Sequence, residues 1–252
     1  MTDIPSRIEI PTVSTMYQQL SKNKLQAGLI STDELWYSRV IGRKISIYFT
    51  WFFLKTGISP NQITGLAFIM GCIGLSLMIF LKSWVFFLGF ICFQLYIILD
   101  SSDGEVARFL SLKSDLGAFF DKLLHIIMKS GIFISLGIGL FILSENAFHL
   151  AIGLVTAYLS LLSSTFYHLL PVNTQIPYAQ QIAQSSRFLA LLRKIYRTIT
   201  GDIEISLVLA ALIVMHQVFG IEILQALIWF ITIQLGLLVL FFVQQMVALF
   251  TH

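Results

Sequence analysis

Residues 62–81 read QITGLAFIMGCIGLSLMIFL, an uninterrupted stretch without a charged side chain. A helix of that length and composition can cross a bilayer, which takes about 17–25 residues. Further long uncharged runs occupy 83–99, 130–144, 146–186, 205–221 and 223–252. Because these runs are continuous and do not alternate apolar with polar residues, they argue against an outer-membrane barrel. The sequence therefore predicts a polytopic helical membrane protein.

The composition of the whole chain agrees with these runs. Of its 252 residues, 57% are hydrophobic and 12% are charged, and the mean hydropathy is +0.85. An ordinary soluble domain is about 45–50% apolar and roughly 25% charged. A core of this size cannot hide the excess apolar surface from water, so soluble protein classes are excluded. The two cysteines, Cys72 and Cys92, lie inside the apolar runs, where we expect them to pack as small apolar side chains.

Turns and charged segments divide the chain into three parts. We expect a polar cytosolic extension over 1–34, an amphipathic interfacial helix over 35–57 and a membrane domain over 58–252. The expected fold class is an all-α integral membrane protein, with six transmembrane helices preceded by that amphipathic helix. The predicted spans are about 62–81, 84–110, 116–143, 147–170, 203–219 and 222–250.

The basic residues predict the orientation of the chain in the membrane. Of 16 Lys and Arg residues, Lys82 alone falls on the side shared by the turns at 82–83, 144–149 and 216–222. Basic residues are in excess on the cytosolic side of membrane proteins. The first 34 residues also show no pattern of a secretory signal. We therefore expect both termini to lie in the cytosol.

Acidic side chains inside apolar helices are costly, so each of them is a functional candidate. Asp100 and Asp103 lie at the cytosolic end of the second predicted span, and Asp121 and His125 lie on the third. Residues three and four apart share a helix face, and a short connection makes the two helices antiparallel neighbours. These side chains can therefore face each other. Carboxylate oxygens suit magnesium or manganese, and paired ions clamp phosphoryl groups during displacement.

Small and basic residues accompany these acids. Gly104 lacks a Cβ and allows a ligand to approach the helix closely, while Arg108 offers a planar fork for phosphate oxygens. The pattern points to a diphosphate site. Glu105 lies off the acidic stripe, and we expect it to pair with Lys113 or Lys122.

Residues 100–108 read DSSDGEVAR, and they are followed by Gly117, Asp121 and His125. This pattern closely resembles the signature of the CDP-alcohol phosphotransferases, Asp-x2-Asp-Gly-x2-Ala-Arg-x8-Gly-x3-Asp-x3-Asp. Seven of its eight fixed positions are met at the right spacing, across 26 residues. Residues 60–64, PNQIT, are similar to the Pro-Asn-x-x-Thr that opens the first span of that family.

The resemblance implies a reaction and a set of site residues. The family transfers the phosphate-linked group of a CDP-alcohol to a second alcohol and releases CMP, usually as a homodimer, and no nucleic acid is expected as a partner. The resemblance implies two Mg²⁺ or Mn²⁺ ions held by Asp100, Asp103 and Asp121. The cytidine diphosphate would be lined by Gly104, Ala107, Arg108 and Gly117, with further contacts from Ser114, Asn61 and Thr64.

The eighth signature position departs from the family, because His125 stands where the fourth aspartate is expected. That aspartate is a metal ligand and the general base. An imidazole can take over both roles near neutral pH, which makes His125, Asp121 and Arg108 the expected catalytic residues. A second interpretation is a protein that binds nucleotide without turnover. A third is a branch of the family with different acceptor chemistry, or a histidine introduced deliberately.

Two questions stay open from the sequence. The lipid is either the donor, as CDP-diacylglycerol, or the acceptor for a soluble CDP-alcohol. An intramembrane prenyltransferase also holds magnesium and diphosphate with aspartates, but the Gly-x2-Ala-Arg spacing and the small number of spans disfavour it. The small size of the chain and the habit of the family favour a prokaryotic plasma membrane.

Overall fold

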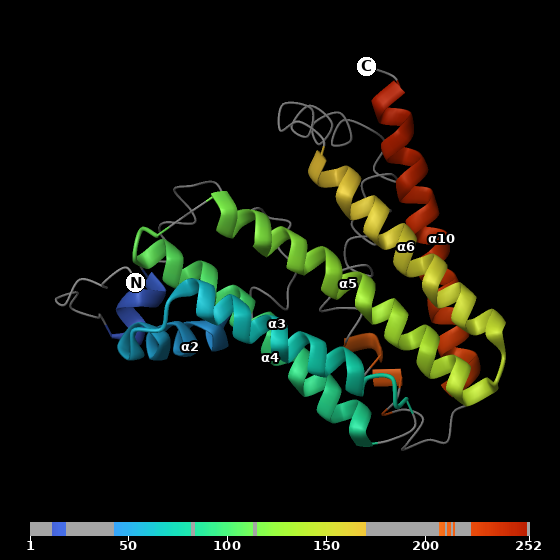
Figure 1. The fold of residues 1–252 in the computed structure, drawn as a ribbon, viewed down its shortest axis with the longest axis horizontal. Coiled ribbons are helices and arrows are strands. Elements are labelled where there is room, and N and C mark those ends of the chain that lie inside the picture. The colour runs from blue at the N-terminus through green and yellow to red at the C-terminus, as the bar shows by residue number, and fades with distance from the viewer. Residues whose placement is uncertain are drawn as a thin grey trace. The chain divides into compact units, whose positions relative to one another are not determined.

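The structure of the protein is a computed structural model in which the described chain is helical and contains no strand (Figure 1). The all-α fold class is therefore confirmed for this part of the chain. The helices are α2 (Arg43–Thr56), α3 (Pro60–Leu77), α4 (Trp84–Phe109), α5 (Asp115–Ser144), α6 (Ala147–Leu169) and α10 (Ile223–Phe250). The described residues are 12–18, 43–81, 84–112, 115–169, 207–209, 211–212, 214 and 223–250.

Four described helices are long and apolar enough to cross a membrane: α3, α4, α5 from Leu116 onward, and α6 as far as Thr165. They correspond to the first four predicted spans. Within α10, Leu224–Leu240 is a shorter apolar segment. Most of the predicted fifth span lies outside the described residues, as does most of the 1–34 extension. The number of six spans therefore stays a prediction.

Helix α3 begins two residues earlier than the sequence indicated, at Pro60. Ser59 precedes it as a capping residue: its backbone N–H donates to Oε1 of Gln62 at 3.0 Å, and its hydroxyl donates to the same oxygen at 3.1 Å. The first of these bonds is one half of a capping box, in which the side chain three residues on accepts from the N–H of the capping residue. Proline is well placed in the first turn of a helix, where its missing N–H costs nothing. The Ser-Pro pair thus starts the helix.

A tight turn ends α4 and leads into α5. Ser111 has a φ of 57°, in the left-handed region, and its N–H donates to the carbonyl of Arg108 at 3.3 Å. The N–H of Leu112 donates to the carbonyl of Ala107 at 2.9 Å. This pair of bonds is the Schellman pattern that ends a helix. Helix α5 begins only a few residues later, at Asp115, as the short predicted connection required.

The chain divides into two compact units, one of Met1–Ile73 with Cys92–Lys122 and one of Gly74–Ile91 with Leu123–His252. In the first unit, the short helix over residues 13–18 rests on α2. There Met16 is fully buried against Ile47, with Trp51 packed beside them. The first unit also contains the acidic end of α4.

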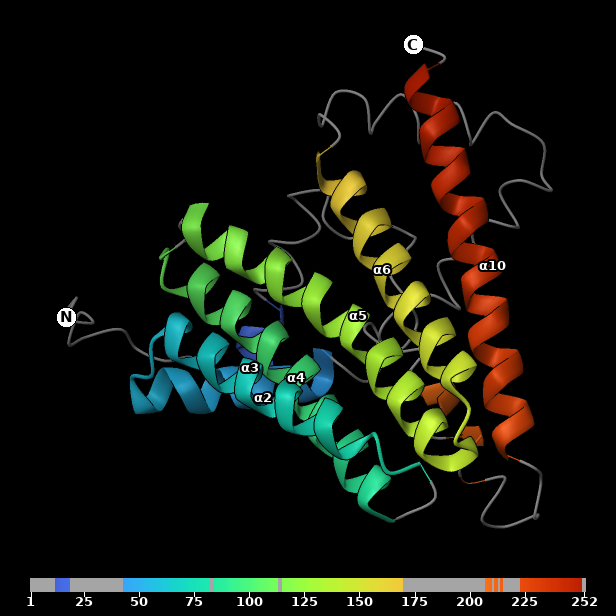
Figure 2. The same cartoon turned by 45° about the vertical axis from the view of Figure 1, so that its right-hand side comes forward.

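In the second unit, glycines bring helix backbones close together. A Cβ built on Gly153 of α6 would lie 2.5 Å from Cα of Gly137 on α5, and one built on Gly89 of α4 would lie 2.8 Å from the carbonyl oxygen of Gly74 on α3. Small residues allow such contacts between helices in membranes, where van der Waals packing drives association. Helix α10 runs alongside α6 (Figure 2).

The contact between Gly137 and Gly153 predicts the effect of one added methyl group. Gly153→Ala should lower the melting temperature of the purified protein, because the obstructing atoms belong to the backbone, and overpacking costs about 1–3 kcal/mol. Gly236→Ala on α10 is the matched control. A Cβ there meets nothing within 4 Å, and alanine is up to about 1 kcal/mol better than glycine in a helix. Equal melting temperatures for the two variants would contradict this packing.

Candidate functional site

The acidic signature occupies the last turns of α4, which continues as a regular helix through it. Asp103 is buried, with 6% of its surface exposed, and Asp100 one turn earlier is half-buried. The hydroxyl of Thr64, on α3, donates a hydrogen bond to the carboxylate of Asp103. The same hydroxyl donates to the carbonyl of Pro60 at 3.0 Å. Thr64, expected only as an accessory residue, thus holds one of the central carboxylates.

Helix α5 brings a second carboxylate to the same place. The charge of Asp121 interacts with that of Asp103, so α5 brings Asp121 near the acidic end of α4. Asp121 is exposed, and Gly117, one turn before it, is half-buried. His125 follows one turn after Asp121 on α5, with an exposed side chain. His125 belongs to the second unit, whose later segment begins at Leu123.

Arg108 folds back over the signature glycine. A Cβ on Gly104 would lie 3.3 Å from Nη1 of Arg108 and 3.6 Å from Nη2, so the guanidinium lies directly above the glycine. Its Nε is buried and makes no hydrogen bond with the described residues, and its charge interacts with that of Asp103. The glycine therefore leaves room for the guanidinium, in addition to any room that it leaves for a ligand.

The remaining predicted contact residues are distributed around this centre. Ala107 is half-buried on α4, and Asn61 is exposed in the first turn of α3. Ser114 lies outside the described residues. The residues that the structure brings together are thus Thr64, Asp103, Arg108 and Asp121.

Metal binding was expected from the acids of both helices. Within the described part of the chain, no three His, Cys, Asp or Glu side chains are grouped as ligands of one ion. Asp103 and Asp121 do approach one another, and two facing carboxylates repel unless a cation lies between them. The oxygen donors of these residues fit magnesium or manganese in type. The ligand set of Asp100, Asp103, Asp121 and His125 stays a prediction.

Glu105 has partners that the sequence analysis did not identify. Its buried carboxylate, 4% exposed, accepts hydrogen bonds from two hydroxyls of α2. Lys113, one of the two lysines expected to pair with Glu105, lies outside the described residues. Ser46 donates to both carboxylate oxygens, at 3.3 and 3.4 Å, and Thr50 donates to Oε2 at 2.8 Å. The signal was present in the sequence: these two hydroxyls are four residues apart on the segment expected to be amphipathic, and so share a face.

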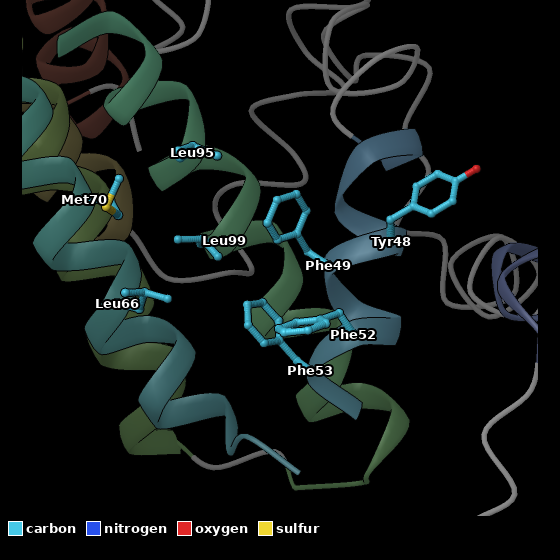
Figure 3. A pocket seen from close by; sticks show the side chains of 8 residues that line it. All are labelled: Tyr48, Phe49, Phe52, Phe53, Leu66, Met70, Leu95 and Leu99. Carbon is cyan, nitrogen blue, oxygen red and sulfur yellow. The ribbon is translucent and has the colours of Figure 1, made fainter. Parts of the chain in front are cut away.

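An apolar cavity of about 560 Å³ adjoins the acidic cluster in the first unit (Figure 3). The side chains from α2 are aromatic: Tyr48, Phe49, Phe52 and Phe53. Those from α3 and α4 are unbranched or aliphatic: Leu66, Met70, Leu95 and Leu99. Figure 3 shows the hydroxyl of Tyr48 pointing away from the others, which leaves an apolar interior. Leu99 precedes Asp103 by four residues, so the cavity lies one helical turn from the buried carboxylate.

Comparison with known families identifies the family to which the chain is similar. The family model of the CDP-alcohol phosphatidyltransferases matches residues 57–237, a range that contains α3, the whole signature and α6. A search of curated proteins found no match to the chain.

The bond between Thr64 and Asp103 gives a testable expectation. Thr64→Val keeps the shape of the side chain and removes its hydrogen-bond donor. The carboxylate of Asp103 is then no longer held in place before a ligand binds. A hydrogen bond to a charged group is worth about 1.5–3 kcal/mol, so the affinity for CDP in the presence of Mg²⁺ should fall at least about tenfold. Isothermal titration calorimetry measures this affinity.

Thr165→Val is the control for this experiment. The Thr165 hydroxyl is equally half-buried but bonds only the carbonyl of Leu161 in its own helix, at 2.8 Å. Its CDP affinity should equal that of the native protein. Equal losses in both variants would mean that the Thr64 hydroxyl has no special role.

Proposed function

Because the chain belongs to the CDP-alcohol phosphatidyltransferase family, we propose that it moves a phosphate-linked alcohol from a CDP-linked donor to an acceptor hydroxyl and releases CMP. The observation that carries this proposal is the arrangement of Asp103 and Asp121 on facing helices, with Arg108 beside them. A diphosphate needs both positive charge and fixed donors around it. The reaction belongs to the synthesis of phospholipids or related lipid headgroups.

In this proposal, the acids position the donor. Asp100, Asp103 and Asp121 would hold two divalent cations, Mg²⁺ or Mn²⁺, and the positive charge of these ions would offset that of the diphosphate. Thr64 keeps the carboxylate of Asp103 in place. The guanidinium of Arg108 binds phosphate oxygens and offsets the charge that develops on the leaving group.

His125 takes the place of the general base. An imidazole nitrogen accepts the proton of the acceptor hydroxyl, a role that histidine often takes in general base catalysis. The acceptor oxygen forms a bond to the β-phosphorus of the donor. The bond from that phosphorus to the bridging oxygen breaks, and CMP leaves with the electron pair.

The cavity beside the signature supports a lipid as one of the two reactants. Its lining of phenyl rings and aliphatic side chains offers no polar partner, which suits an acyl chain. An acyl chain in the cavity would bring the headgroup of its lipid to the level of Asp103, one turn along α4. We also propose that the signature faces the cytosol and that the protein works as a homodimer.

The reaction predicts CMP release by the purified protein with Mg²⁺ or Mn²⁺, from CDP-diacylglycerol with polar acceptors or from soluble CDP-alcohols with diacylglycerol. Asp100→Asn should reduce CMP release at least about a hundredfold, because it removes a charge from the centre. Glu145→Gln makes the same change at an exposed residue in the turn between α5 and α6, and should leave the rate unchanged. Chelation of the metal should stop the reaction.

A parallel His125→Asp sample distinguishes turnover from binding alone. CMP release by the native protein supports the proposed reaction, and the best donor identifies the lipid. No release by the native protein, with release by His125→Asp, would instead mean that the natural site binds nucleotide without turning it over.

Filling the cavity should act on the lipid reactant alone. Leu66→Trp places a bulky ring at the lining, and the KM for a reactant with long acyl chains should rise about tenfold, as expected when roughly 1.4 kcal/mol of contact is lost. Leu88→Trp is the control, since both leucines are exposed, 44% and 54%, but Leu88 does not line the cavity. Equal KM values in the two variants would contradict the binding of an acyl chain in this cavity.

A further inference from the structure

Glu105 is a buried acid within the signature segment that the proposed reaction does not use. Helix geometry advances by about 100° per residue, so Glu105 points roughly 200° away from Asp103. Its partners confirm this direction, because they come from α2, whereas the partner of Asp103 comes from α3. Glu105 therefore points away from the acidic stripe and toward α2.

Three hydrogen-bonding groups join α2 and α4 at this point. The hydroxyls of Ser46 and Thr50 donate to Glu105, and the hydroxyl of Ser102 donates to the carbonyl of Ser46 at 3.2 Å. All four residues are buried. A buried carboxylate is costly without hydrogen bonds, and bonds to a charged acceptor are stronger than those between neutral groups. This contact therefore fixes the position of α2 on α4 more firmly than apolar packing alone.

The same face of α2 forms one wall of the cavity. Phe49, Thr50 and Phe53 lie three, four and seven residues after Ser46, which places all four on one stripe of the helix. The two hydroxyls hold Glu105, and the two phenyl rings line the cavity opposite the leucines of α4 (Figure 3). A shift of α2 at the polar positions must therefore move the rings.

We propose that Ser46, Thr50 and Glu105 form a latch that sets the width of the apolar cavity, which makes Glu105 a positioning residue for the lipid reactant. The inference rests on the proposed function for the identity of that reactant. The latch acts through α2 and touches neither nucleotide nor acceptor. Its loss should affect the lipid more than the water-soluble reactant.

The test removes the donors and leaves the signature intact. In the double variant Ser46→Ala/Thr50→Ala, both hydroxyls facing Glu105 are lost. The matched control is Thr56→Ala on the same helix, because its hydroxyl donates only to the carbonyls of Phe52 and Phe53 within α2, at 3.0 and 3.2 Å. Glu105→Gln keeps an acceptor oxygen in the same place and serves as the conservative variant.

Amide hydrogen exchange tests the latch without any need for activity. In the double variant, exchange over α2 should accelerate at least about tenfold, as expected for lost bonds to a charged acceptor. The control should show the native rate except in its last turn, and Glu105→Gln should lie between them. Unchanged exchange over α2 in the double variant would overturn the latch, whatever the protein catalyses.

Two readouts test the effect on the cavity. The KM for the lipid reactant should rise about tenfold in the double variant, while the KM for the soluble reactant stays within about twofold, because only the wall of the cavity moves. In phosphatidylglycerol nanodiscs, photo-crosslinking of a lipid with a diazirine on its acyl chain to the Phe49–Phe53 region should fall in parallel. Equal rises of both KM values, or native crosslinking, would overturn the positioning role.

Failure of the proposed function has a different signature. If the native protein releases no CMP from any donor, the proposed reaction is wrong, and exchange and crosslinking still decide the latch. Faster exchange together with reduced crosslinking would then show that the latch holds the wall of a lipid-binding cavity in place.

Discussion

The arrangement of the first unit depends on the need to satisfy carboxylates buried in an apolar helix. Burying a charge is costly unless hydrogen bonds compensate, and α4 buries two acids two positions apart. Asp103 takes its bond from Thr64 of α3, and Glu105 takes its bonds from α2. Because each acid requires donors from a different neighbour, the polar end of α4 determines which helix lies on each of its sides.

This division separates the reactive face of α4 from its supporting face. The charges of Asp121, on α5, and of Arg108 interact with that of Asp103 on one side, where a diphosphate can be bound. The hydroxyls of α2 meet the other side, and the cavity lies between the two along Leu95 and Leu99. A substrate with a charged headgroup and an apolar chain fits this arrangement. Successive turns of α4 would contact its two parts.

The second unit is held together by a different kind of contact. Its close approaches are between glycines, such as Gly137 with Gly153, and a hydroxyl of α5, that of Ser135, donates to the carbonyl of Leu75 at 2.8 Å. In a membrane, apolar side chains gain little by leaving lipid, so closeness of backbones supplies the attraction. Hydrogen bonds to buried carboxylates thus characterise the first unit, and close packing at glycines characterises the second.

The sequence by itself determined the helical membrane class, the first four long apolar helices and the stripes that brought Asp103 and Asp121 together. Periodicity is sufficient for these, because it says which residues share a face of their own helix. Only the tertiary structure decided which helix each face meets. It assigned Thr64 to Asp103, gave Glu105 the hydroxyls of α2, and formed the apolar cavity. Serine and threonine recur along apolar helices and often bond their own backbone, so a hydroxyl donor is recognised only once its acceptor is placed beside it.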